Sequence, residues 1–228
     1  MGKISLYILL TLIYIGFSKS TGSFKENRPL LKSEKIFDPF FQNAPVSVVL
    51  IGMFEQGFFL KSYFLRLRLV HAYFPTEDIV IQTSREFYEK NLNNLGMSIY
   101  QRRSLEIPGL SIPQPSGTIF LGDLTYGLWK LDKSGERVWE FHRAFRNFPE
   151  ILGWGKFRPS MDFFHNLKIH DSYKQSYYGP NGEFGKNGSV SSKYFFPSTD
   201  QDSRKTERFL PHLKKLFSLS IQKGATNE

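Results

Sequence analysis

One apolar run, residues 46–53, constrains the fold of this chain more than any other feature. It reads Val-Ser-Val-Val-Leu-Ile-Gly-Met, and its length and β-branched content are typical of a strand covered on both faces. A turn follows, and residues 58–74 are predicted to form a helix that Pro75 ends. Leucine alternates with arginine in residues 65–69, which would instead suit a strand. The helix is preferred because parallel strands need a crossover between them.

The next segments extend this pattern to an α/β domain. Residues 77–83 predict a second strand, and Ser84 is a suitable N-cap for a helix that would end at Leu95-Gly96. Residues 98–102 and 118–121 are further strand candidates. Residues 126–141 predict a β-hairpin, because the turn sequence Asp-Lys-Ser-Gly separates two runs of alternating polarity. The expected fold is therefore α/β, with a mixed sheet flanked by helices.

The composition changes after this hairpin. Residues 143–200 are rich in aromatic side chains, glycine and asparagine and show weak periodicity, which predicts an irregular extension packed on the domain. The expected organisation is a signal peptide (1–20), a linker (21–45), an α/β domain (46–148), an aromatic extension (149–200), and a basic C-terminal helix and tail (201–228).

The N-terminal residues predict entry into the secretory pathway. Lys3 precedes an apolar stretch from Ile4 to Phe17, and Ser-Lys-Ser follows at residues 18–20, where a signal peptidase would cut. An uncleaved signal anchor is the alternative, although the stretch is shorter than a typical membrane span. The formal charge is +9, and removing residues 1–20 takes away two lysines and leaves +7.

Composition narrows the range of partners. The chain has no cysteine, so its core must be sufficient without disulfides. The basic charge is explained most simply as a solubilising surface, and the alternative is an acidic partner. Such a partner is expected to be an acidic glycan or an unidentified protein rather than nucleic acid. The C-terminal helix that Pro211 would open carries Lys214 and Lys215 beside an apolar stripe. It is expected to pack on its own domain, and an anionic membrane surface is the alternative.

Three segments carry a family resemblance. They are Val-Ser-Val-Val-Leu at 46–50, Asp-Ile-Val-Ile at 78–81, and Leu-Trp-Lys-Leu-Asp-Lys-Ser-Gly at 128–135. Their order and spacing resemble the thioredoxin superfamily, and in particular the N-terminal domain of selenoprotein P, from about Phe40 to about Phe148. This resemblance implies a thioredoxin-like sheet.

The same resemblance places the positions of the redox pair, a selenocysteine and a cysteine in that family, at Gln56 and Phe59. Neither side chain can form the thiolate that disulfide exchange needs. The cis-proline that thioredoxins place before the late strand is also missing, because residues 124–127 read Leu-Thr-Tyr-Gly. The family's redox activity is therefore not expected.

Few other residues suggest chemistry. Glu55 at the expected helix start could help to form an anion site, but helix capping is the simpler interpretation. Asp162, His165, His170 and Asp171 match no established metal-ligand spacing, so no metal site is assigned. Asn187-Gly188-Ser189 is an N-glycosylation acceptor or a chance match. The sequence assigns no catalytic residue and no cofactor.

Two functions remain as hypotheses. The first is a secreted, redox-inactive thioredoxin-like protein that acts by binding. The second is a nucleotide-sugar-dependent transferase of the secretory pathway, for which Asp123 is the best candidate metal ligand because it follows an expected strand.

Overall fold

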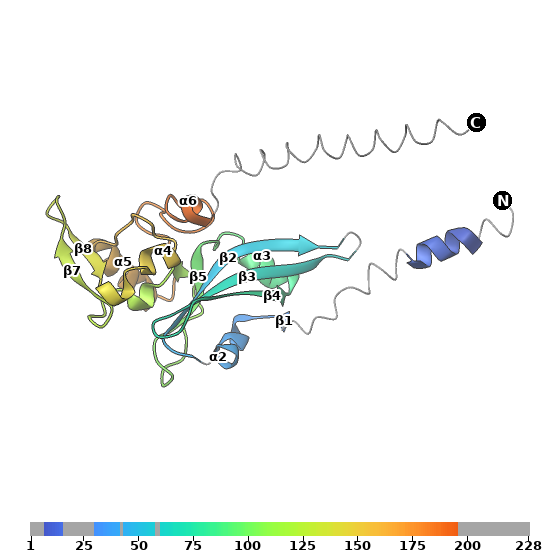
Figure 1. Cartoon of the computed structure of the whole chain (residues 1–228), viewed down its shortest axis with the longest axis horizontal. Coiled ribbons are helices and arrows are strands. Elements are labelled where there is room, and N and C mark those ends of the chain that lie inside the picture. The colour runs from blue at the N-terminus through green and yellow to red at the C-terminus, as the bar shows by residue number, and fades with distance from the viewer. Residues whose placement is uncertain (1–6, 16–29, 42, 58–59, 196–228) are drawn as a thin grey trace, which may run out of the picture.

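The computed structural model describes residues 7–15, 30–41, 43–57 and 60–195 (Figure 1). Several predicted features lie outside these ranges, namely the signal cleavage site, residues 21–29 of the linker, Phe59, and the basic C-terminal helix and tail. Residues 7–15 form an exposed helix. No helix within the described ranges is both long and apolar enough to span a membrane.

A six-stranded mixed sheet forms the centre of the fold, with the strand order β1-β4-β3-β2-β5-β6. The short strand β1 runs parallel to β4, and every other neighbouring pair is antiparallel. The strands are β1 (Leu30–Leu31), β2 (Val46–Gln56), β3 (Ser62–His71), β4 (Glu77–Thr83), β5 (Met97–Arg102) and β6 (Gln114–Pro115). The sheet confirms the predicted α/β class with a mixed sheet.

The helix predicted over residues 58–74 is wrong, because β3 occupies most of this segment and pairs with β2 in a long antiparallel hairpin (Figure 1). The Leu-Arg alternation explains the result. Leu65 and Leu67 are fully buried, whereas Arg66 between them is exposed, as the two-residue period of a strand requires. No crossover helix is needed, because β3 pairs antiparallel with both β2 and β4.

The middle of the chain follows the prediction more closely. Strand β4 spans the predicted 77–83, although it runs antiparallel to β3. Ser84 caps α3 (Arg85–Lys90) by accepting a hydrogen bond of 3.2 Å from the backbone N–H of Phe87. This helix ends at Lys90, before the predicted Leu95-Gly96. Strand β5 is confirmed, but the expected strand at 118–121 is a single 3₁₀ turn, η2 (Thr118–Phe120).

One face of the sheet is covered by two short helices. These are α2 (Phe37–Phe40), preceded by the 3₁₀ turn η1 (Glu34–Ile36), and α3. The rings of Phe37 and Phe87 meet edge to face, with centroids 5.9 Å apart. The cluster beneath them includes alternate residues of β2, β3 and β4, namely Val46, Val48, Leu50, Leu65, Leu67 and Ile81.

The other face of the sheet packs against the C-terminal half of the chain. There the predicted hairpin is confirmed as β7 (Gly127–Leu131) and β8 (Arg137–Phe141). The predicted irregular extension instead contains η3 (Arg143–Phe145), α4 (Phe148–Ile151), α5 (Met161–Ser172) and α6 (Ser191–Phe195). Ser160 is a local sequence signal for the start of α5. Its hydroxyl oxygen caps the helix by accepting a hydrogen bond of 3.2 Å from the backbone N–H of Phe163.

Aromatic side chains join this half to the sheet. Trp139 is fully buried, and the cluster around it includes Val49 and Val70 of the sheet. Two further contacts fix the segment before η2. The N–H of Gly117 lies 3.1 Å from Ser47 Oγ, and Trp154 Nε1 donates to the Ser116 carbonyl oxygen at 2.9 Å. The described part of the predicted aromatic extension is therefore part of the packed core.

Candidate binding pocket

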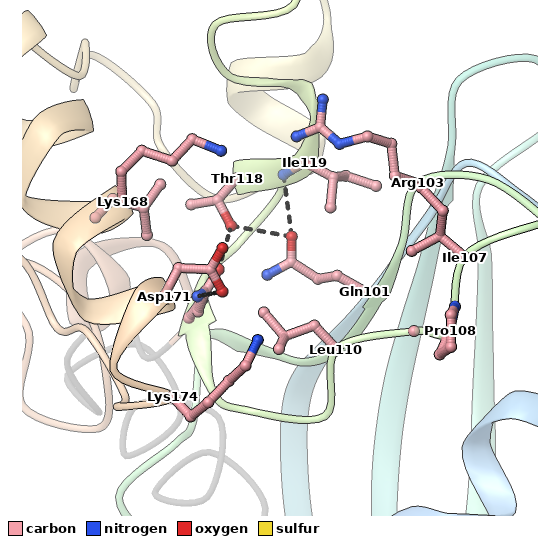
Figure 2. Close-up of a pocket in the computed structure, with 13 residues that line it drawn as sticks. Gln101, Arg103, Ile107, Pro108, Leu110, Thr118, Ile119, Lys168, Asp171 and Lys174 are labelled. Atoms are coloured by element: carbon pink, nitrogen blue, oxygen red, sulfur yellow. Dashed lines mark hydrogen bonds between the residues drawn. The ribbon is translucent and has the colours of Figure 1, made fainter.

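A pocket of about 410 Å³ lies where β5, the loop after it, η2 and α5 meet (Figure 2). Such a volume is within the range of small-molecule sites. Its walls combine apolar groups from residues 107–110 with Ile119 and Leu167, and polar groups that come from β5, β6, η2 and α5. The pocket joins segments that are up to about 70 residues apart in the chain.

Gln101 of β5 is the most buried polar side chain in the pocket, with 2% of its surface exposed. Its Oε1 accepts the backbone N–H of Ile119 at 3.0 Å and the hydroxyl of Thr118 at 2.9 Å. These two bonds determine which end of the amide is oxygen and which is nitrogen. If the amide were flipped, its NH₂ group would face the N–H of Ile119, and two donors cannot form a hydrogen bond. The Nε2 group is buried and has no hydrogen-bond partner in the described part of the chain.

The loop that forms one wall is held by Asp38 of α2. Its Oδ1 accepts the Tyr100 hydroxyl at 2.6 Å and the Gly109 N–H at 3.0 Å. The bond from Tyr100 is the largest cause of a lowered pKa for Asp38, and burial opposes it. Burial and the same bond raise the pKa of Tyr100, so its hydroxyl stays protonated as the donor. The loop is also anchored by paired backbone bonds between Gln101 and Leu110.

Three cations and one carboxylate surround the pocket. Arg103 lies 3.6 Å from Asp123, at the outer limit of an ion pair. Lys168 of α5 stands over the ring of Phe164 at 5.3 Å, and Lys174 follows the end of α5. Neither lysine has a carboxylate within ion-pair distance among the described residues.

Asp171 is the acid of this group. Its Oδ1 lies 3.4 Å from Gln114 Nε2, a long and weak hydrogen bond, so it can still accept from a ligand. The pocket thus offers a local excess of positive charge, an unpaired amide donor, one acceptor carboxylate and an apolar wall. This combination suits a small ligand that carries one negative charge and polar groups.

The residues that the resemblance singled out lie elsewhere. Gln56 is exposed at the end of β2, far along the β2–β3 hairpin, and Phe59 lies outside the described residues. The expected helix cap at Glu55 is wrong, and so is the alternative of an anion site at a helix start, because Glu55 belongs to a strand and forms an ion pair of 2.7 Å with Lys61. Hairpin β2–β3 therefore replaces the turn-to-helix geometry that a redox site would use.

The acidic and histidine residues of 162–171 do not form a metal site. Among the residues that the structure describes, no group of three or more such side chains is placed to hold a metal ion. His170 Nδ1 donates to the Asn166 carbonyl oxygen at 2.8 Å, and its ring packs on Tyr177. Asp162 and His165 are exposed on α5.

Asp123 and Asn187 have different surroundings. Asp123, the expected ligand of the transferase hypothesis, accepts the N–H of Thr125 at 3.0 Å and pairs with Arg103. Asp123 therefore stabilises a turn beside the pocket. Asn187 is exposed in a loop, where a glycan could be attached.

Comparisons with known proteins leave the family open. No protein-family model, curated protein or solved structure matches this chain. The pocket is accordingly interpreted from its own chemistry.

Proposed function

We propose that this protein is secreted and acts by binding an acidic partner, without thiol chemistry. The observation that carries the proposal is the pocket itself, where Arg103, Lys168 and Lys174 gather around a buried, unpaired amide N–H. An acidic glycan is the preferred partner, since a basic, concave site attracts anions and also holds a polar body. The absence of any cysteine in the sequence supports the exclusion of thiol exchange.

The relationship to the thioredoxin superfamily also remains a proposal. It is supported by the segments 77–83 and 126–141, which form a strand and a hairpin as the resemblance implies. The β2–β3 hairpin counts against it, because the first helix of that pattern is replaced by a strand. The transferase hypothesis remains a prediction, and a thermal shift with a nucleotide sugar plus Mn²⁺ would test it.

Secretion is tested by expressing the full chain in a eukaryotic host. We expect the protein in the medium, shortened by the predicted signal peptide of residues 1–20. Retention of the uncleaved chain in cell membranes would favour the signal-anchor alternative.

Binding is tested by retention on immobilised heparin across a salt gradient, beside an equally basic control protein. We expect stronger retention than the control, with a steep loss as salt rises, because organised charge is screened within about 10 Å at 0.1 M salt. Retention equal to the control would mean that the charge serves only solubility, and the proposal would fail.

Two matched triple variants locate the site. Arg103→Gln, Lys168→Gln and Lys174→Gln together remove the three pocket cations. Lys133→Gln, Arg137→Gln and Arg146→Gln remove the same charge from exposed positions around the β7–β8 hairpin. We expect the first variant to elute at clearly lower salt than the second. If the two variants eluted at the same salt concentration, heparin binding would not depend on the cations of the pocket.

A further inference from the structure

The side chain of Gln101 indicates which atom a ligand must supply. Its Oε1 is fully engaged by Ile119 and Thr118, so its Nε2 has to satisfy its hydrogens elsewhere. That nitrogen is buried without a partner in the described residues. An unpaired buried donor destabilises the site, and a ligand oxygen at this place would remove that penalty.

A positive charge lies near the same space. Figure 2 shows the amide of Gln101 and the ammonium group of Lys174 directed toward one region beside Asp171. An ammonium group and an amide N–H together suit a carboxylate, which can accept from both. The two donors are therefore best satisfied by one carboxylate group.

The neighbouring acid restricts the charge of the ligand. Asp171 lines the same pocket and would repel a dianion such as phosphate more strongly than a singly charged carboxylate. Its oxygens can instead accept hydrogen bonds from ligand hydroxyls, as can the oxygen of Thr118. The ligand should therefore combine one carboxylate with several hydroxyl groups.

The opposite wall is apolar. Ile107, Pro108 and Leu110 supply hydrocarbon surface from the loop that Asp38 anchors. The carbon–hydrogen face of a sugar ring can lie against such a wall while its hydroxyls face the polar side. The pocket volume of about 410 Å³ accommodates one such ring with room for part of a neighbour.

We propose that this pocket binds the hexuronic acid unit of an acidic saccharide, with its carboxylate between Gln101 Nε2 and Lys174 and its hydroxyls toward Asp171 and Thr118. This inference rests on the proposed function, because it names the chemical group that the acidic partner presents to the site. It assigns specificity to the carboxylated ring and leaves Arg103 and Lys168 to attract the rest of a longer chain.

The experiment is a calorimetric titration of the purified protein with glucuronate. Glucose serves as the neutral control, and inorganic sulfate and phosphate serve as the anion controls. We expect saturable binding of glucuronate. Binding of glucose and of either inorganic anion should be at least about tenfold weaker, since hydrogen bonds to a charged group are stronger than those between neutral groups.

Gln101→Glu keeps the size and the acceptor oxygen of the side chain but places an oxygen where Nε2 was. We expect it to weaken glucuronate binding about tenfold or more. Gln82→Glu makes the same change on β4, away from the pocket, and should leave binding unchanged. If Gln101→Glu fails to fold, Lys174→Gln tests the same contact from an exposed position.

The outcomes separate the two proposals. Retention on heparin without glucuronate binding would overturn the hexuronate assignment and leave the proposed function standing. Glucuronate binding that both Gln101→Glu and Lys174→Gln leave intact would also overturn it, because the ligand would lie elsewhere. Failure of both heparin and glucuronate binding would overturn the proposed function together with this inference.

Discussion

Arg68 and Asp78 lie directly opposite each other on β3 and β4, and their side chains form two parallel hydrogen bonds. Arg68 Nε donates to Oδ1 at 2.8 Å and Nη2 donates to Oδ2 at 2.9 Å. Nη1 of the same arginine lies 3.4 Å from the Ile151 carbonyl oxygen, at the end of α4. One side chain therefore links two strands of the sheet to the C-terminal half.

This pair predicts a pH-dependent contribution to stability. The hydrogen bond from Arg68 lowers the pKa of Asp78 below the ordinary 3.8. The folded state thus keeps the carboxylate ionised where the unfolded chain would bind a proton. The contribution is fully present above about pH 4 and is lost as the pH falls through the lowered pKa of the folded state.

Asp78→Asn should therefore lower the free energy of unfolding at pH 7 and have less effect at pH 3. We expect a loss below about 1 kcal/mol at pH 7, because the side chain of Asp78 is 44% exposed and solvent screens the pair. Urea denaturation at both pH values measures it, with Arg68→Gln and the double variant completing a cycle. If Asp78→Asn lowered the free energy of unfolding equally at both pH values, the lowered pKa would not be the source of the stabilisation.

Asp38 should control the loop that forms the apolar wall of the pocket. Tyr100→Phe removes the hydroxyl that donates to Asp38 at 2.6 Å, so Gly109 loses the support of a fixed acceptor. We expect a destabilisation of about 1–2 kcal/mol and faster amide exchange in residues 105–110. Hydrogen exchange read by mass spectrometry measures it, and Tyr173→Phe, at an exposed tyrosine, is the control. Unchanged exchange in the loop would show that Asp38 does not hold it.

A side chain at Gly117 should destabilise the fold. Its φ of 69° is left-handed, and an added Cβ would lie 2.5 Å from the methyl groups of Leu152. Gly135 has a similar φ of 83°, but nothing lies within 4 Å of an added Cβ. We expect Gly117→Ala to cost about 2 kcal/mol more than Gly135→Ala, since overpacking adds to backbone strain. Thermal denaturation compares the two, and equal losses would mean that only the backbone conformation matters.

Asn187 should carry a glycan when the chain passes through a eukaryotic secretory pathway. The acceptor asparagine is exposed, and the loop around it turns at Gly185 with a φ of 91°. Asn187→Gln should abolish a mass increment that endoglycosidase treatment also removes, while leaving stability unchanged. An identical mass for both proteins before treatment would show that the site is unoccupied.

Local sequence was sufficient where neighbouring residues decide the structure. The turn at residues 132–135 forms with its own backbone and side-chain bonds, and Asp132 Oδ1 accepts the Ser134 N–H at 2.8 Å. The cap at Ser84 depends on a residue three positions later. These contacts act within a few residues, so their signals are visible in the chain itself.

Residues 58–74 show where local pattern was insufficient. The aromatic and aliphatic spacing of three and four residues fits a helix, and the alternation of leucine and arginine at 65–69 fits a strand. Pairing with β2 on one side and β4 on the other decided between them, because it satisfies the backbone groups of β3 and buries Leu65 and Leu67. Such partners lie in other parts of the chain and have no local signal.

The pocket depended on the tertiary structure in the same way. The sequence pattern singles out His170 and Asp171 but not Gln101. The importance of Gln101 comes from its buried amide, which is oriented by the N–H of Ile119 in η2. By itself, the sequence determined the α/β class, the lack of any cysteine, the late hairpin and the capped α3. Tertiary structure decided the strand pairing and the pocket, because both depend on hydrogen bonds and charges brought together from distant segments.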